Sequence, residues 1–223
     1  LAALIEKEQE KWLAAENPEY WLEPTNSGLF TLASRDVKGM YYFHSNWNPQ
    51  LEAVEFANYY YDMTCGNYIV LGFGLGYHCE ALVNMDEDIC INIYENDLSV
   101  VVQAMMANNL GWLWNNENVN IIYDNDFSTM SKELSKTDVE DKVFVIHHPS
   151  LRHIKNSEIR AKLEHIFIRD SGIRNQRALM ESNFNSNIRN KTDVIDVLKE
   201  RFDGKHGIIV AAGPSLDNNV EQL

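Results

Sequence analysis

The sequence predicts an α/β fold: a Rossmann-like parallel sheet with helices on both faces, preceded by a small β-rich layer and followed by a long connector helix. The apolar run Tyr68–Leu71 leads into a glycine-alternating turn at residues 72–76, which is typical of a buried strand that ends in a sharp turn. A second apolar run, Ile89–Tyr94, follows. Strand-like and helix-like segments then alternate as far as residue 147, and this alternation indicates a parallel sheet with right-handed crossovers.

The glycine-alternating turn is the first candidate binding site. Gly72, Gly74 and Gly76 give the spacing GxGxG, and Glu95 follows about 20 residues later, at the end of the second strand. Ligands of such sheets bind at the carboxyl ends of the strands, where an acidic side chain can accept hydrogen bonds from a ribose. Gly72, Gly74, Gly76 and Glu95 are therefore the predicted cofactor-binding residues.

Two other functions remain open for this turn. The third glycine comes one position earlier than in dehydrogenases, so the spacing is nearer to that of SAM-dependent methyltransferases, with Glu95 for the ribose and Asp124 or Asp126 near the adenine. Against that function, the fourth strand ends in His-His-Pro-Ser at residues 147–150, where many amino-methylating enzymes have Asp/Asn-Pro-Pro-aromatic. The glycines could also serve only close packing of helix on strand, in a pure interaction module.

Composition excludes several classes of protein. The chain has 223 residues, 45% of them hydrophobic and 11% aromatic, which is enough for a packed core. Its net charge is −14, and residues 1–150 carry 7 basic and 23 acidic side chains, so binding to nucleic acid is disfavoured. No apolar run approaches the length of a membrane span and no signal peptide opens the sequence, so we expect a cytoplasmic protein.

Cysteine and histidine patterns predict neither a disulfide framework nor a metal site. The three cysteines lie between residues 65 and 90, are odd in number and lack CxxC spacing. His78, His147 and His148 follow predicted strands, but no histidine or cysteine cluster has recognisable ligand spacing. We expect these histidines to be satisfied by local hydrogen bonds.

The basic side chains concentrate after the fourth predicted strand. Residues 151–223 carry 12 basic and 10 acidic side chains, and many of the basic ones lie in Leu151–Arg177. A solvated helix surface explains most such runs. The alternative is a surface that faces an anionic ligand or an acidic neighbouring domain, with Arg152 and His153 helping to hold an anion at the edge of the sheet.

The pattern predicts four segments. Residues 1–66 form an N-terminal helix and a small β-rich subdomain, 67–170 the Rossmann-like domain, 171–206 a helical connector, and 207–223 the truncated start of a second Rossmann-like domain. The sequence begins with Leu and stops inside an apparent helix start, so we expect a fragment of a longer protein. Its oligomeric state stays open.

Three stretches occur in order and at suitable separation: residues 44–49, 71–78 and 211–217. Together they resemble the motility accessory factor (Maf) glycosyltransferases of flagellated bacteria. The resemblance implies an N-terminal Rossmann-like domain, followed by a catalytic domain similar to sialyltransferases and to 6-hydroxymethylpterin pyrophosphokinase. It further implies transfer of a nonulosonic acid, pseudaminic or legionaminic, from its CMP-activated form to Ser or Thr of flagellin, a step of flagellar assembly and motility.

The resemblance also implies a nucleotide-sugar site at Gly213, Pro214 and Ser215. A strand-to-helix turn of this composition presents backbone N–H groups and a hydroxyl to a phosphate, so the donor, CMP-nonulosonic acid, would bind there. The alternative is a plain turn capped by Ser215. We assign no catalytic residue, because the family's catalytic groups would lie beyond Leu223, and we expect this fragment to be an inactive scaffold or acceptor-binding module.

Overall fold

The computed structural model describes residues 2–15, 18–135, 142–189 and 204. Residues 1–171 form one compact unit and 172–223 another. The predicted nucleotide-sugar turn and most of the predicted connector beyond Arg189 lie outside the described residues. The four predicted segments stay a prediction.

The described elements alternate as the sequence predicts. Asn48 begins one of the helices, since its side chain accepts a hydrogen bond from the backbone N–H of Leu51, and Pro49 occupies the first turn. In chain order the elements are α1 (Ala2–Ala14), β1 (Tyr20–Pro24), β2 (Phe30–Asp36), β3 (Gly39–Tyr42), α2 (Pro49–Tyr60), β4 (Asn67–Leu71), α3 (Tyr77–Met85), β5 (Cys90–Glu95), α4 (Leu98–Ala107), α5 (Gly111–Trp114), β6 (Val119–Tyr123), α6 (Ser128–Leu134), β7 (Lys142–Ile146), the 3-10 helix η2 (His148–His153) and α7 (Ser157–Arg189).

Four parallel strands form the centre of the fold, in the order β6-β5-β4-β7. The chain moves outward from β4 to β6 and then crosses to β7 on the other side of β4, as in one half of a Rossmann fold. The point where the strand order reverses lies between β4 and β7, which is where such sheets usually bind a ligand. The predicted fold class is confirmed.

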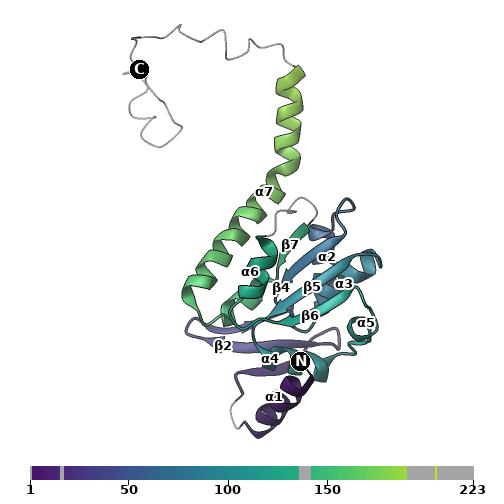
Figure 1. Cartoon of the computed structure of the whole chain (residues 1–223), viewed down its shortest axis with the longest axis vertical. Helices are drawn as coiled ribbons and strands as arrows, with labels where there is room; N and C mark the ends of the chain where they lie inside the picture. Colours follow the sequence, from purple (N-terminus) through teal and green to yellow (C-terminus); the bar gives the residue numbers. More distant parts are fainter. Residues whose placement is uncertain (1, 16–17, 136–141, 190–203, 205–223) are drawn as a thin grey trace. The chain divides into compact units, whose positions relative to one another are not determined.

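Side chains of β4 alternate between two cores. Tyr68 and Val70 belong to the larger core, which includes residues of α2, α3 and α4, whereas Ile69 and Leu71 pack in a second core with residues of α6 and α7. Because both faces of the strand are covered, its sequence is a continuous apolar run rather than an alternating one. Figure 1 shows helices on both faces of the sheet.

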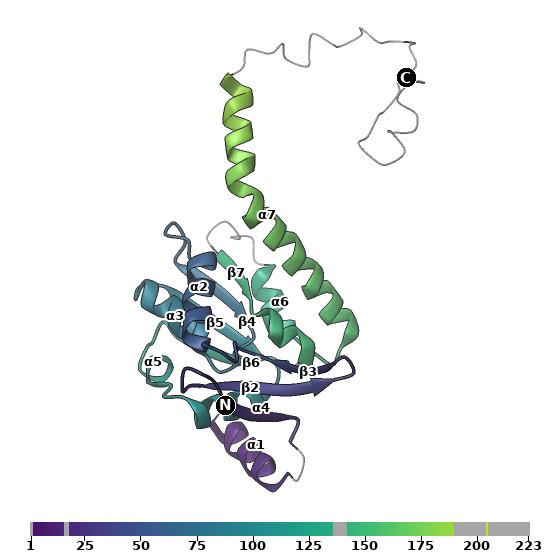
Figure 2. The same cartoon turned by 180° about the vertical axis from the view of Figure 1, so that it is seen from behind.

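A small antiparallel sheet, β1-β2-β3, lies across the end of the parallel strands (Figures 1 and 2). The sequence predicts its hairpin from two β-rich runs, and the structure adds β1, which pairs with β2 from Tyr20↔Ser34 to Pro24↔Phe30. Phe43 and His44 directly follow β3 and are buried. The antiparallel sheet thereby brings residues 43–44 to the carboxyl ends of β4 and β7.

The position of α7 corrects the sequence analysis. The recurrence of apolar residues on one side predicts a long helix from Arg174 to Phe202, but α7 already begins at Ser157, so the basic segment and the start of the predicted connector are one helix. Asn156 precedes this helix, and its side chain accepts hydrogen bonds from the N–H groups of Glu158 and Ile159. The sequence also gave no signal for α5 or η2. None of the described helices is both long and apolar enough to cross a membrane.

Replacing Leu82 by Ala should lower the free energy of unfolding by about 2–5 kcal/mol, because this α3 side chain is fully buried in the larger core. The exposed Leu13, at 66% accessibility, provides the control: Leu13→Ala should change it by less than about 0.5 kcal/mol. Urea denaturation measures both values. Equal decreases in the free energy of unfolding for the two variants would contradict the assignment of Leu82 to the core.

Candidate functional site

The glycine loop, residues 72–76, follows β4 at the carboxyl edge of the sheet. Gly72 and Gly74 have φ angles of 90° and 51°, a region that favours glycine. A Cβ at Gly72 would overlap the side chain of Ser150, and one at Gly74 would lie 2.5 Å from Nε2 of His44. The glycines therefore allow side chains of the protein itself to pack against the loop.

The backbone N–H groups of Gly72, Phe73, Leu75 and Gly76 in the glycine loop are already hydrogen-bonded. Phe73 N–H donates to Oε2 of Glu95 at 2.9 Å, and Leu75 N–H donates to Nε2 of His44 at 2.8 Å. Gly76 N–H donates to the carbonyl of Phe73. A phosphate or carboxylate ligand would need these same donors. Within the protein as described, the loop is closed rather than poised for an anion.

Glu95 is the residue that closes the loop. Its side chain is 1% exposed, and besides the N–H of Phe73 it accepts those of Asn96 and Asp97 at 2.8 and 3.0 Å. Nε2 of His153 lies 3.2 Å from Oε1 of Glu95. The structure thus brings the four predicted cofactor-binding residues together, but they bond to other parts of the chain. Cofactor binding by them stays a prediction.

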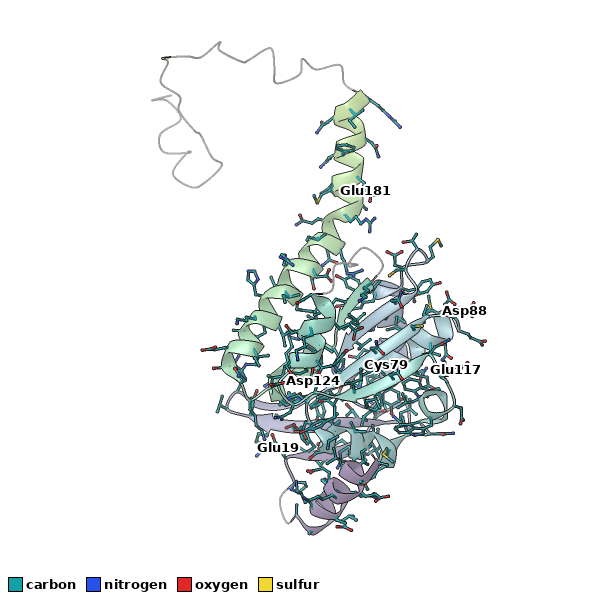
Figure 3. The ribbon with its side chains drawn as sticks, viewed as in Figure 1. Glu19, Cys79, Asp88, Glu117, Asp124 and Glu181 are labelled. Atoms are coloured by element: carbon teal, nitrogen blue, oxygen red, sulfur yellow. The ribbon has the colours of Figure 1, made fainter. Side chains whose placement is uncertain are left out.

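Figure 3 labels Asp124, a candidate from the sequence analysis, and Cys79, one of the three cysteines. Asp124, after β6, accepts a hydrogen bond from the N–H of Met130 at 2.8 Å, so it holds the start of α6. Cys79 is a fully buried free thiol, and burial raises its pKa. Neither residue is presented to a ligand.

A histidine cluster of His44, His78 and His147 lies against the glycine loop. The rings of His78 and His147 stack at 4.3 Å with an interplanar angle of 7°, and His44 stacks on His147 at 4.9 Å. All three are buried, and each offers a ring nitrogen within 4.8 Å of the other two. The sequence analysis missed this convergence, and His44 altogether, because the residues follow β3, lie in α3 and follow β7. The only signal available was that two of them occur where predicted strands end.

Hydrogen bonds indicate which ring nitrogen carries a proton in His44 and His78. Nε2 of His44 accepts from Leu75, so its proton is on Nδ1, whereas Nε2 of His78 lies 3.1 Å from the carbonyl of Gly72 and must donate to it. Burial, followed by the neighbouring His44, lowers the pKa of His78 to about 3. Burial and the other histidines likewise lower the pKa of His147.

Neutral imidazoles are metal ligands, but this arrangement does not suit an ion. A metal lies in the plane of each ring that binds it, and two parallel rings 4.3 Å apart do not share a plane. The Nε2 lone pair of His44 is also occupied by the N–H of Leu75. The cluster therefore acts as packing above the glycine loop, and the expectation of no metal site stays a prediction.

An open groove lies beside this closed edge. This hairpin groove has a volume of about 710 Å³ and is bounded by the β2–β3 hairpin on one side and by η2 and the first turns of α7 on the other. Arg152 of η2 binds Asp36 of β2 through two nitrogens at 2.8 and 3.0 Å, and its guanidinium lies 4.0 Å from the centre of the Tyr41 ring. The hydrogen bond from Arg152 is the main reason that the pKa of Asp36 is lowered.

The fold and this site define a Rossmann-like α/β domain whose glycine loop is closed by the protein's own side chains. The chain belongs to the glycosyltransferase Maf N-terminal domain family, whose match covers residues 2–169. The family resemblance predicted from the sequence is confirmed.

A Maf glycosyltransferase of known structure from Magnetospirillum magneticum AMB-1 is similar over 78% of this chain, with 14% identity and a TM-score of 0.45. The chain spans 35% of the length of that protein. A search of curated proteins found no match.

Stability should fall below neutral pH because of the histidine cluster. The folded-state pKa values of His78 and His147 lie below the unfolded value of about 6.5, so as pH decreases through 6.5 these two residues take up protons in the unfolded chain but not in the folded chain. Each such group then costs up to about 1.4 kcal/mol per pH unit. Urea denaturation at several pH values measures this slope, which should become shallower in His78→Gln; an unchanged slope would contradict the assignment.

Gly72→Ala should destabilise the protein more than Gly28→Ala. Both glycines have positive φ, 90° and 82°, so both substitutions strain the backbone by about 1–2 kcal/mol. Only the Cβ at Gly72 meets another side chain, that of Ser150; at Gly28 nothing lies within 4 Å. Thermal unfolding measures the difference, and it should shrink when Gly72→Ala is made in a Ser150→Gly background. If both substitutions lowered the thermal stability equally, the loop would not be packed as described.

Proposed function

We propose that this chain is the N-terminal region of a bacterial glycosyltransferase that transfers a nonulosonic acid, pseudaminic or legionaminic, from its CMP-activated form to Ser or Thr of flagellin. Membership of the Maf glycosyltransferase N-terminal domain family supports the class of enzyme. In this proposal the described unit binds the acceptor protein, and the donor binds in another part of the enzyme.

The closed glycine loop supports placing the donor elsewhere. The N–H groups of Phe73 and Leu75 would have to lose Glu95 and His44 before they could bind a phosphate. Breaking buried hydrogen bonds of this kind costs about 1–3 kcal/mol for each group left unsatisfied. The same geometry gives no support to a SAM-dependent methyltransferase, which would need this loop open.

The hairpin groove is the feature that suits a protein acceptor. It is open, combines apolar and charged side chains, and has more basic than acidic groups although the whole chain has a net charge of −14. Val37 and Met40, at its hairpin wall, are highly exposed. Its basic side chains are Arg35, Lys38, Arg152, Lys155 and Arg160, and its acidic ones are Glu19, Asp36 and Glu164.

Some of these charges neutralise one another. Arg152 pairs with Asp36, and Lys155 lies 3.6 Å from Glu19. Within the described part of the chain, no ion pair is found for Lys38 or for the two other arginines of the groove. Positive charge therefore remains available for an acidic segment of the acceptor, and this complementarity should steer association more than it adds affinity. The proposal rests on one observation: the glycine loop is closed, whereas the groove beside it is open and has more basic than acidic side chains.

Reversing the two charges in Lys38→Glu/Arg160→Glu should weaken binding of purified flagellin to this chain by roughly tenfold, mainly by slowing association. Lys132→Glu is the matched control, because Lys132 is an exposed lysine of α6 outside the groove. Surface plasmon resonance at two salt concentrations would measure both rates. The difference between the variants should shrink at high salt.

Equal flagellin binding by the double variant and the control would contradict the groove as the acceptor site.

Calorimetric titration with S-adenosylmethionine and with CMP tests the methyltransferase alternative and the location of the donor site. Binding of S-adenosylmethionine that is lost in Glu95→Ala would favour the methyltransferase function. Binding of CMP that is lost in Lys38→Glu/Arg160→Glu would make the groove a donor site instead.

A further inference from the structure

A second cavity lies at the carboxyl ends of β5 and β6, where ligands of α/β sheets commonly bind. Its volume is about 450 Å³, within the range of small-molecule sites. We call it the amide cavity, because asparagine side chains follow both strands there: Asn96 after β5 and Asn125 after β6. Neither the glycine loop nor the hairpin of the groove contributes to its wall.

Several polar groups of the amide cavity have donors or acceptors that are not used in hydrogen bonds to other described residues. The side-chain amide of Asn125 and the hydroxyl of Tyr123 make no hydrogen bond to another described residue. The side-chain oxygen of Asn96 takes the N–H of His153 at 3.0 Å, which leaves its two amide hydrogens for a ligand. These amides and the hydroxyl can donate and accept, as the vicinal hydroxyls of a sugar require.

Charge in the amide cavity disfavours an anion. Glu8, Asp97 and Asp126 line it against a single cation, Lys155. Hydrogen bonds from Ser128 lower the pKa of Asp126, so this carboxylate is ionised at neutral pH. A phosphate or a carboxylate-bearing sugar would meet an excess of like charge.

Apolar side chains complete the wall. Leu98, Phe127 and Ile159 line the cavity together with Tyr123, a residue that is 39% exposed. Phe127 is the one non-glycine residue with positive φ, 57°, in the described part of the chain, and such strain is found more often at binding sites than elsewhere. The exposed aromatic side chain of Tyr123, next to the free amides, suits a ligand with an apolar C–H face and a polar hydroxyl edge.

We propose that the amide cavity binds a neutral saccharide of one or two units. Asn96 and Asn125 hydrogen-bond its hydroxyls, and the ring of Tyr123 packs against its C–H face. The proposal does not depend on the acceptor site in the hairpin groove, because the groups that would bind the sugar are absent from that groove.

Saturation-transfer NMR on this chain tests the proposal, with the methyl glycosides of N-acetylglucosamine, N-acetylgalactosamine and galactose as neutral probes. N-acetylneuraminic acid is the anionic probe. At least one neutral glycoside should give a saturable signal, and the anionic sugar should not. Asn125→Ala should weaken binding of the neutral sugar by roughly three- to tenfold, as expected for one or two lost hydrogen bonds. Tyr123→Ala should weaken this binding by a similar factor.

Asn120→Ala is the matched control. Asn120 lies on the same strand, β6, and its side chain bonds to Asn92 rather than to the cavity. This variant should bind the neutral sugar as the unaltered chain does. Three results would overturn the proposal: no saturable signal from any neutral glycoside, stronger binding of the anionic sugar, or equal effects of Asn120→Ala and Asn125→Ala. Flagellin binding measured on Asn125→Ala should be unchanged, so failure of this site and failure of the groove can be told apart.

Discussion

The carboxylate of Glu95 is the interaction on which the carboxyl edge of the sheet depends. It is buried, and its two oxygens accept three backbone N–H groups and contact the ring of His153. Burying a carboxylate is costly unless hydrogen bonds compensate it, and here they come from three separate segments of the chain. One side chain therefore fixes the glycine loop, the turn into α4 and the end of η2 relative to one another.

This constraint changes what the Rossmann-like sheet can do. Where the strand order reverses, between β4 and β7, such a sheet usually offers an open crevice. In this protein the antiparallel sheet brings Phe43 and His44 to that place, where they stack on His147 and His153. The crevice is filled with aromatic and imidazole rings, and burial lowers the pKa of two of them, His78 and His147. The hairpin groove and the amide cavity both lie beside this closed edge.

The hairpin groove and the amide cavity share the segment His153–Lys155 but differ in charge. Basic side chains outnumber acidic ones in the groove, whereas acidic side chains outnumber basic ones in the cavity. Because charge of one sign favours the opposite sign and repels its own, neighbouring sites of this kind select different ligands. An acidic protein segment and a neutral sugar could therefore occupy one unit without competing.

Local pattern was sufficient to determine the strands other than β1 and most of the helices. The continuous apolar run before Gly72 predicted a strand buried on both faces, and the glycine spacing predicted a turn that only glycine tolerates well. These are properties of neighbouring residues, so the sequence alone carries them. The start of α7 was predicted wrongly, because a mixed basic surface hid the continuity of one helix from residue 157 to 189.

What only the tertiary structure decided is the closure of the loop and the composition of the two cavities. His44 and Leu75 are 31 residues apart and Asp36 and Arg152 are 116 apart, and no local periodicity encodes which distant side chains meet at the edge of a sheet.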